Sequence, residues 1–235
     1  MGNSPSLYEC PENYSALPQR PLVINLGLAK SGTTSLHEFF RCSGWCSRHD
    51  WGTLTHAMLA TLAFAQSQST VNADAILRAR LGTPADVLAE VNDAFRCVFP
   101  QVDHLDHLLR FFPEACFVQT TRPVDHWIRS LRGWRLPNGV TLLGSMITRC
   151  PIRPRDESGL RTWYLRHERR VRKALSGRQC ALVIDIEKDP GVELARHFSR
   201  TNESCWGHHN ARRTRMVPPW VRRQLRLRYR GARWR

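Results

Sequence analysis

Short apolar runs alternate with longer amphipathic stretches along most of the chain. The runs at residues 22–26, 115–121 and 180–186 are flanked by Pro, Gly or polar residues, and this pattern predicts three buried strands. Apolar positions at helical spacing lie near each run. They predict helices over residues 33–42, 123–134, 157–175 and 190–198.

The order of these elements predicts the fold class. Strands that alternate with helices form a parallel sheet covered on both faces, so we expect a three-layer α/β domain. Helical spacing also covers residues 53–97, where Thr83 and Pro84 give a helix-start signal. A ligand of such a sheet binds outside the carboxyl ends of its strands, and we expect the functional site there.

Length and local composition predict the domain organisation. A chain of 235 residues fits one α/β domain with a sizeable core. Residues 1–20 are polar and contain prolines, which predicts a flexible N-terminal arm. Residues 21–235 form the expected single domain, with a basic C-terminal helix or tail from about residue 216.

The charge of the chain indicates an anionic partner. The formal net charge is +15 and the sequence pI is about 10.5, which suits a nucleotide, a polyanionic substrate, nucleic acid or a membrane surface. Lysine is rare among the basic residues, occurring at positions 30, 173 and 188. A lysine at position 30 is therefore informative, because its compact ammonium reaches a single oxygen in a way that a guanidinium does not.

Cysteine usage and the N-terminus predict the cellular setting. Eight cysteines without a regular spacing predict reduced thiols, not a disulfide framework. The N-terminus lacks a secretory pattern and no apolar run is long enough to span a bilayer, so a soluble, cytoplasmic protein is expected. The first residues match the myristoylation pattern at Gly2, which would add membrane contact only if the lipid were attached.

The turn after the first apolar run has the chemistry of an oxyanion cradle. Gly27 permits a tight turn and Gly32 permits close backbone approach to a ligand. The amides at the start of the following helix attract anions through their free N–H groups and the helix dipole. Further donors are Lys30, Ser31, Thr33, Thr34 and Ser35. Simple helix capping would require only one of these hydroxyls.

This turn is not the usual nucleoside-triphosphate loop, in which lysine follows the second glycine. The order K-S-G-T-T at residues 30–34 instead resembles the 5′-phosphosulfate loop of sulfotransferases. Arg122 and Ser130 occur at the spacing by which that family binds the 3′-phosphate of its donor, and a guanidinium can bind a phosphate bidentately.

The resemblance extends along most of the chain. The family's other positions are matched by Trp127, Tyr164, His167 and a His-Asn pair at 209–210. Two departures are visible: R-P replaces the commoner R-D at residues 122–123, and E-K-D-P-G follows the third strand where the family usually has a glycine-tryptophan pair. These departures concern acceptor recognition more than donor binding.

The resemblance implies a P-loop nucleoside triphosphate hydrolase-like fold of the sulfotransferase type. It implies 3′-phosphoadenosine 5′-phosphosulfate as the co-substrate and transfer of its sulfuryl group to a hydroxyl or amine. Lys30 would stabilise the leaving phosphate in an in-line displacement, and no metal is expected. The acceptor is not specified, although the positive charge makes an anionic carbohydrate one candidate.

The acceptor must lose a proton, so a catalytic base is expected. In the family the base comes from the segment after the first helix or from the segment before the arginine strand. The candidates here, in order of preference, are His49, His104 and Asp50.

Three other functions compete with this interpretation. Cys42, Cys46 and His49 have a loose zinc-like spacing, to which Cys205, His208 or His209 could add a distant ligand. A kinase would use Asp185 at the end of the third run to hold magnesium, but the position of the loop lysine argues against it. The arginine-rich and aromatic C-terminal run favours a nucleic-acid-binding protein.

Overall fold

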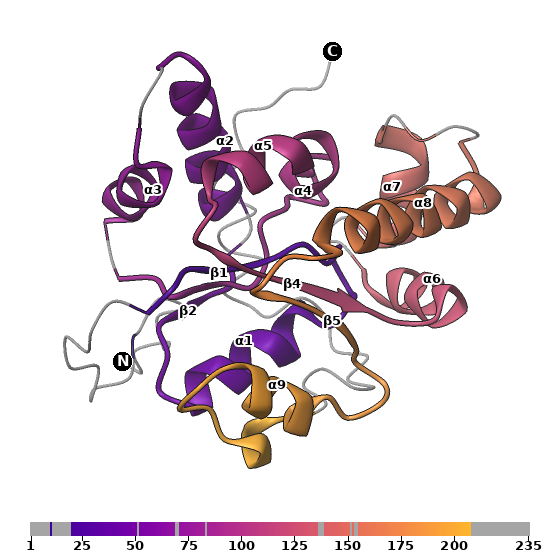
Figure 1. Ribbon diagram of the computed structural model, residues 1–235. Coiled ribbons are helices and arrows are strands. Elements are labelled where there is room, and N and C mark those ends of the chain that lie inside the picture. Colours follow the sequence, from indigo (N-terminus) through magenta and orange to yellow (C-terminus); the bar gives the residue numbers. More distant parts are fainter. Residues whose placement is uncertain are drawn as a thin grey trace, which may run out of the picture.

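A five-stranded, wholly parallel sheet in the order β2-β3-β1-β4-β5 forms the centre of the protein (Figure 1). The computed structural model describes Cys10, residues 20–50, 52–68, 71–82, 84–135 and 139–150, Ile152 and residues 155–207. The strands are β1 Val23–Asn25, β2 Ser47–Arg48, β3 Val87–Leu88, β4 Cys116–Thr121 and β5 Ala181–Asp185. The expected α/β class with a parallel sheet is confirmed.

Helices cover both faces of the sheet, as Figure 1 shows. One face carries α1 (Thr33–Cys42) and α9 (Gly191–His197), joined by the short helix η1 (Glu203–Cys205). On the other face lie α2 Thr53–Gln66, α3 Ala73–Leu81, α4 Pro100–Asp103, α5 Leu105–Phe111 and α8 Glu157–Leu175. Beside α8, α6 (Val124–Gly133) packs against it and against α7 (Leu142–Arg149).

Strand periodicity explains how the sheet holds these two helical layers. Side chains of a strand alternate between faces. Accordingly, Val23 of β1 packs in the cluster that contains Phe40 of α1, whereas Ile24 packs in the cluster that contains Met58 of α2. Both faces are covered, so the strands are apolar on both sides and the sequence shows continuous apolar runs there.

One predicted helix is wrong. Thr83 lies outside the described residues, and the chain after Pro84 forms β3, which pairs with β1 on one side and β2 on the other. Val87 and Leu88 are fully buried. β2 and β3 contain two residues each, which is too short for the sequence pattern to reveal them as strands. Sheet pairing with distant partners overrides the local helix signal in this segment.

The prediction of reduced thiols is also wrong, because all eight cysteines form disulfides. Their partners lie far apart in sequence, so spacing along the chain carries no sign of the pairing. Two of the bonds join separate elements of the fold. Cys116–Cys180 joins β4 to the residue before β5, and Cys42–Cys205 joins α1 to η1. The remaining pairs are Cys97–Cys150 and Cys10–Cys46.

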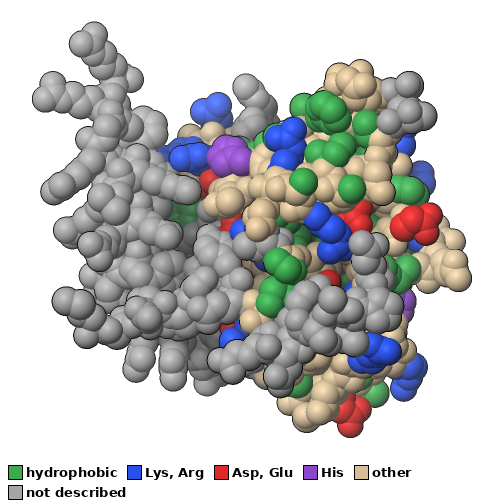
Figure 2. All heavy atoms as spheres, turned by 90° about the vertical axis from the view of Figure 1, so that its left-hand side faces the viewer, with side chains coloured by type: hydrophobic (Ala, Val, Ile, Leu, Met, Phe, Trp, Pro, Cys, Tyr) green, Lys and Arg blue, Asp and Glu red, His purple; other side chains and the backbone are tan. Residues whose placement is uncertain are grey.

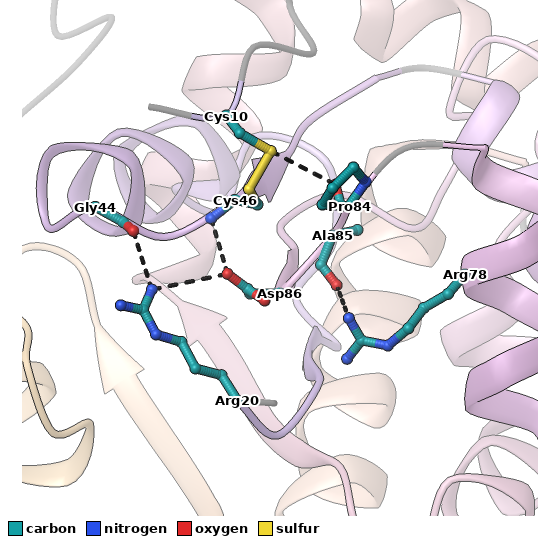
Figure 3. The surroundings of a disulfide bond; sticks show 8 residues. All are labelled: Cys10, Arg20, Gly44, Cys46, Arg78, Pro84, Ala85 and Asp86. Atoms are coloured by element: carbon teal, nitrogen blue, oxygen red, sulfur yellow. Dashed lines mark hydrogen bonds and ion pairs between the residues drawn. A yellow bond between two sulfur atoms is a disulfide. The ribbon is translucent and has the colours of Figure 1, made fainter. Parts of the chain in front are cut away.

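The Cys10–Cys46 bond attaches the N-terminal segment to the β2 edge of the sheet (Figure 3). Around it, the buried carboxylate of Asp86 accepts a hydrogen bond from the Cys46 amide at 3.0 Å and forms an ion pair with Arg20 at 3.7 Å. Arg20 also donates to the Gly44 carbonyl at 3.0 Å. The expected N-terminal arm is therefore covalently held at Cys10.

Several sequence-based expectations fall outside the described residues, namely Gly2, the basic run from about residue 216 and the His-Asn pair at 209–210. Within the described part of the chain, no helix is both long and apolar enough to cross a membrane. Figure 2 shows the side of the molecule on which the sheet ends at β2. There, the Lys and Arg side chains that the structure describes are interspersed with acidic and hydrophobic ones.

We expect the native protein, denatured without reductant, to show no thiol that reacts with a thiol reagent, and the reduced protein to show eight. Replacing Cys42 and Cys205 together by serine should lower the free energy of unfolding by about 2–5 kcal/mol, because that bond closes a long loop. Denaturant titration measures this loss. Free thiols in the unreduced protein would contradict the pairing.

Candidate functional site

The backbone of the turn between β1 and α1 lies close to the end of β4. A Cβ atom at Gly27 would lie 2.0 Å from Thr120 Oγ1, so only glycine fits there. The Ser31 hydroxyl donates to the Leu28 carbonyl at 2.6 Å and lies 2.9 Å from Thr120 Oγ1. Ser31 thus stabilises the turn from within.

Asn25, the last residue of β1, fixes the turn to both neighbouring strands. Its buried side-chain oxygen accepts hydrogen bonds from the amides of Gly27 at 3.0 Å and Thr120 at 3.2 Å. Its side-chain nitrogen donates to the Ala89 carbonyl after β3 at 2.8 Å. One amide therefore joins the carboxyl ends of β1, β3 and β4, where a ligand of a parallel sheet is expected.

The first turn of α1 retains the donors that an anion requires. The N-cap residue is Gly32, at φ 104°, and no side chain caps the helix there. The first intrahelical bond runs from the Leu36 amide to the Gly32 carbonyl at 3.0 Å. The hydroxyls of this region therefore do not act as simple caps. The amides of Thr33, Thr34 and Ser35 belong to the uncapped first turn, which favours a bound anion.

Lys30 lies in the turn with a left-handed backbone, at φ 68°. Its ammonium lies 4.0 Å from the centre of the Trp134 ring, a residue that follows α6. Burial lowers the pKa of Lys30 to about 8; attraction to Glu90 opposes this decrease and repulsion from Arg122 adds to it. Lys30 is therefore a better proton donor near neutral pH than an exposed lysine.

Arg122 directly follows β4, and its Nη1 donates to the Lys30 carbonyl at 3.3 Å. The structure thus brings Arg122 to the turn, although the two residues are distant in sequence. Ser130 lies on α6, which begins just after Arg122, and is partly exposed. The Nε and Nη2 atoms of Arg122 contact Glu187, at 3.2 Å and 2.7 Å from its Oε1.

Buried aromatic and imidazole side chains of α6 and α8 hold the backbone around these groups. Trp127 Nε1 donates to the Ala29 carbonyl at 2.9 Å, and His167 Nε2 donates to the Leu26 carbonyl at 2.9 Å. The Tyr164 hydroxyl donates to the Arg122 carbonyl at 3.0 Å, and its ring stacks on Trp127 with centroids 4.3 Å apart. These residues position the turn through its carbonyls and leave its amides available.

Among the predicted bases, His49 is the one that the described contacts join to the turn. Its Nε2 lies 3.0 Å from Thr33 Oγ1, 3.4 Å from Thr34 Oγ1 and 2.8 Å from a carboxylate oxygen of Glu90. Glu90 is not among the site residues predicted from the sequence, because it lies in the stretch of residues 53–97 with helical spacing. The sequence does contain a signal, because Glu90 is an acidic residue among the apolar residues that follow Pro84. In the structure its carboxylate is 3% exposed.

Asp50 and His104 have other surroundings. Asp50 is buried, forms an ion pair with Arg48 at 3.2 Å and accepts a hydrogen bond from the Leu54 amide in α2 at 2.8 Å. These contacts join its carboxylate to Arg48 and to the start of α2. His104 lies between α4 and α5, where its ring packs 5.9 Å from that of His107. In the described part of the chain, no hydrogen bond or ion pair joins either side chain to Lys30 or the turn.

The residues considered as metal ligands are engaged elsewhere. Cys42, Cys46 and Cys205 are oxidised in disulfides and cannot serve as thiolate ligands in this state. Asp185 accepts a hydrogen bond from the Glu187 amide at 3.1 Å and pairs with Lys188 at 3.9 Å. The portion of the chain that the structure describes contains no group of three or more His, Cys, Asp or Glu side chains arranged to hold a metal ion.

A family model described as a sulfotransferase domain matches residues 22–225, which include the turn, Glu90 and Arg122. No curated protein matches the chain.

The buried imidazole of His167 predicts how stability depends on pH. Burial lowers the pKa of His167 to about 4 from an ordinary value of 6.5. The unfolded chain therefore takes up this proton first on acidification. The stabilisation is fully present above about pH 6.5 and is lost as the pH falls toward 4, by about 3 kcal/mol at most.

Denaturant unfolding across this pH range should show the loss in the wild type. Replacing His167 by glutamine keeps a side-chain N–H for the Leu26 carbonyl and removes the titration, so the acid-dependent loss should be smaller. His56→Gln, at an exposed position of α2, is the matched control and should behave like the wild type. An unchanged pH profile in His167→Gln would contradict a buried neutral imidazole.

Proposed function

The chain belongs to the sulfotransferase family, and on that premise we propose that this transferase uses 3′-phosphoadenosine 5′-phosphosulfate as its donor. The observation that carries the proposal is the meeting of Lys30, the uncapped start of α1 and Arg122 at the carboxyl ends of β1 and β4. Two cationic side chains and a set of helix amides at one sheet edge suit a ligand with two separate phosphate groups.

The residues present fit this donor. A Cβ at Gly27 would clash with Thr120, and one at Gly32 would lie 2.5 Å from Ile186 Cγ2, so the turn has no room for a side chain at these two positions. The α1 amides and Lys30 would hold the 5′-phosphosulfate, and Arg122 with Ser130 would hold the 3′-phosphate. The donor supplies an activated sulfuryl group with a phosphate as its leaving group.

Lys30 would neutralise the negative charge that grows on the leaving phosphate. Such stabilisation is strongest where donors are fixed before reaction and water is excluded. Lys30 is held by the turn and stacks against Trp134, which keeps its ammonium partly away from water. A pKa of about 8 leaves Lys30 mostly protonated at neutral pH and able to share its proton.

Glu90 is the proposed base that takes the proton of the acceptor hydroxyl or amine. Its carboxylate is buried at the same edge of the sheet, is attracted to Lys30 and contacts His49 Nε2 at 2.8 Å. His49 would orient this carboxylate, and the Thr33 hydroxyl would in turn orient His49. In this proposal the base and the cation would act on the acceptor and on the leaving phosphate, respectively.

The disulfides favour an oxidising compartment as the working location, in place of the cytoplasm. Disulfides persist in oxidising environments and are rare in cytosolic proteins. Cys10, near the N-terminus, and Cys205, near the end of the described chain, both take part in such bonds. The thiol count described above tests this proposal when it is made on protein isolated from its own cells without reductant.

Calorimetric titration with adenosine 3′,5′-bisphosphate, the spent donor, tests the donor site. We expect micromolar binding that Lys30→Ala and Arg122→Ala each weaken at least about tenfold, because each removes a charge-assisted contact. Lys173→Ala, at an exposed position of α8, is the matched control and should bind as the wild type does.

ATP with magnesium is the competing ligand in the same titration. Tighter binding of magnesium-ATP than of the bisphosphate would refute the sulfotransferase donor and support a kinase. Duplex DNA that binds with a steep salt dependence, in the absence of bisphosphate binding, would support the nucleic-acid alternative.

Glu90→Gln tests the proposed base because it keeps the shape of the side chain and removes its basicity. Turnover of the donor with water or a small phenol as acceptor should fall about 10²- to 10⁴-fold, while the affinity for the bisphosphate stays within about threefold. A large loss in His49→Ala with little loss in Glu90→Gln would instead assign the base to His49.

A further inference from the structure

Glu187 contacts Arg122, and the residue before it in the chain packs on the turn. In the sheet, Thr121 of β4 is paired with Asp185 of β5, so the residues that follow the two strands emerge side by side. The Ile186 amide donates to the Thr121 carbonyl at 3.0 Å, and the Ile186 side chain packs on Gly32. Glu187 is thereby placed next to Arg122, which follows β4.

The carboxylate of Glu187 binds two basic side chains in the way that a phosphate would. Its Oε1 accepts from Arg122 Nη2 at 2.7 Å and from Nε at 3.2 Å, and its Oε2 lies 2.5 Å from His126 Nδ1. Burial opposes the charged form, but hydrogen bonds from Arg122 and His126 hold the pKa of Glu187 below its usual range. The group is therefore an anion at neutral pH.

This contact occupies the Nε and Nη2 edge of Arg122, with which a guanidinium binds a carboxylate or phosphate bidentately. Nη1 is directed to the Lys30 carbonyl. A phosphate that binds the same edge has to displace the carboxylate, because two anions on one guanidinium edge repel each other. Glu187 is also the first residue of the E-K-D-P-G stretch that departs from the family pattern.

We propose that Glu187 is an internal anion that competes with the 3′-phosphate of the nucleotide for Arg122 and so sets how strongly this protein prefers a 3′-phosphorylated nucleotide. The inference rests on the proposed donor site. A nucleotide without a 3′-phosphate leaves the Glu187–Arg122 contact intact. Its affinity therefore does not rise when the Glu187 carboxylate is removed. A nucleotide with a 3′-phosphate gains affinity when the competing carboxylate is removed.

Calorimetric titration of Glu187→Gln with adenosine 3′,5′-bisphosphate and with adenosine 5′-monophosphate tests this competition. The bisphosphate should bind about tenfold tighter than to the wild type, whereas the affinity for the monophosphate should change less than about twofold. Glu187→Ala is the second variant, which removes the side chain in case the amide still occupies Arg122. Glu193→Gln, exposed on α9, is the matched control for the loss of one negative charge.

A double substitution separates direct competition from a general change in charge. In an Arg122→Ala background, Glu187→Gln should no longer improve bisphosphate binding, because the contested guanidinium is gone. An equal gain for the monophosphate, or a gain that survives Arg122→Ala, would overturn the proposal. Equal or weaker bisphosphate binding by both Glu187 variants would do the same, and weaker binding would show that Glu187 supports Arg122.

The outcomes also distinguish this inference from the proposed function. If the wild type binds the bisphosphate through Lys30 and the Glu187 variants show no gain, the donor site stands and the competition is refuted. If the Glu187 variants bind the bisphosphate and the wild type does not, Glu187 blocks Arg122 completely and the competition is supported. If no protein in the set binds it, the donor assignment and this inference both fail. Thermal unfolding of each variant confirms that the compared proteins are folded.

Discussion

The close approach of the turn after β1 to the end of β4 is the constraint on which the rest of the structure depends. Gly27 has no space for a Cβ beside Thr120, and Asn25 binds the backbone on both sides of the gap. This contact aligns the uncapped start of α1 with the carboxyl end of β4. An anion site made largely of backbone donors requires such an alignment, because amides cannot adjust their position as side chains can.

The buried polar residues of α6 and α8 serve the same constraint. Trp127 and His167 bind carbonyl oxygens of the turn, and Tyr164 binds the carbonyl of Arg122. These hydrogen bonds involve neutral groups in a densely packed region, where an unpaired carbonyl would be costly. The helical layer is therefore more than a cover for the sheet, since its side chains determine where the charged groups of the site lie.

Charges at the site are balanced before any ligand binds. Glu90 attracts Lys30 and binds His49, and Glu187 binds Arg122 and His126. Such pairing limits the repulsion between the cations and holds their side chains in place. At the proposed donor site, affinity for a nucleotide would then depend on which acids remain in contact with the cations. The net charge of +15 therefore says little about the local balance at the site.

The sequence by itself determined the elements whose signals are local. The helices Thr33–Cys42 and Glu157–Leu175 have the predicted bounds, and the three longer apolar runs contain β1, β4 and β5. The composition of the turn, with its glycines, lysine and hydroxyls, indicated an oxyanion because each of those properties belongs to neighbouring residues. Lys30 could be named for the same reason, whereas Arg122 was expected only from the resemblance to sulfotransferases.

Only the tertiary structure decided the features that depend on distant partners. β2 and β3 are two-residue strands defined by sheet pairing, and the segment after Pro84 joined them despite its helical pattern. The disulfides join cysteines that are 36 to 163 residues apart, a separation at which spacing is uninformative. Glu90 and Glu187 could be recognised only through their contacts with His49 and Arg122, which follow other strands. Local pattern reports propensity and periodicity, whereas these contacts exist only once the sheet has brought the carboxyl ends of its strands together.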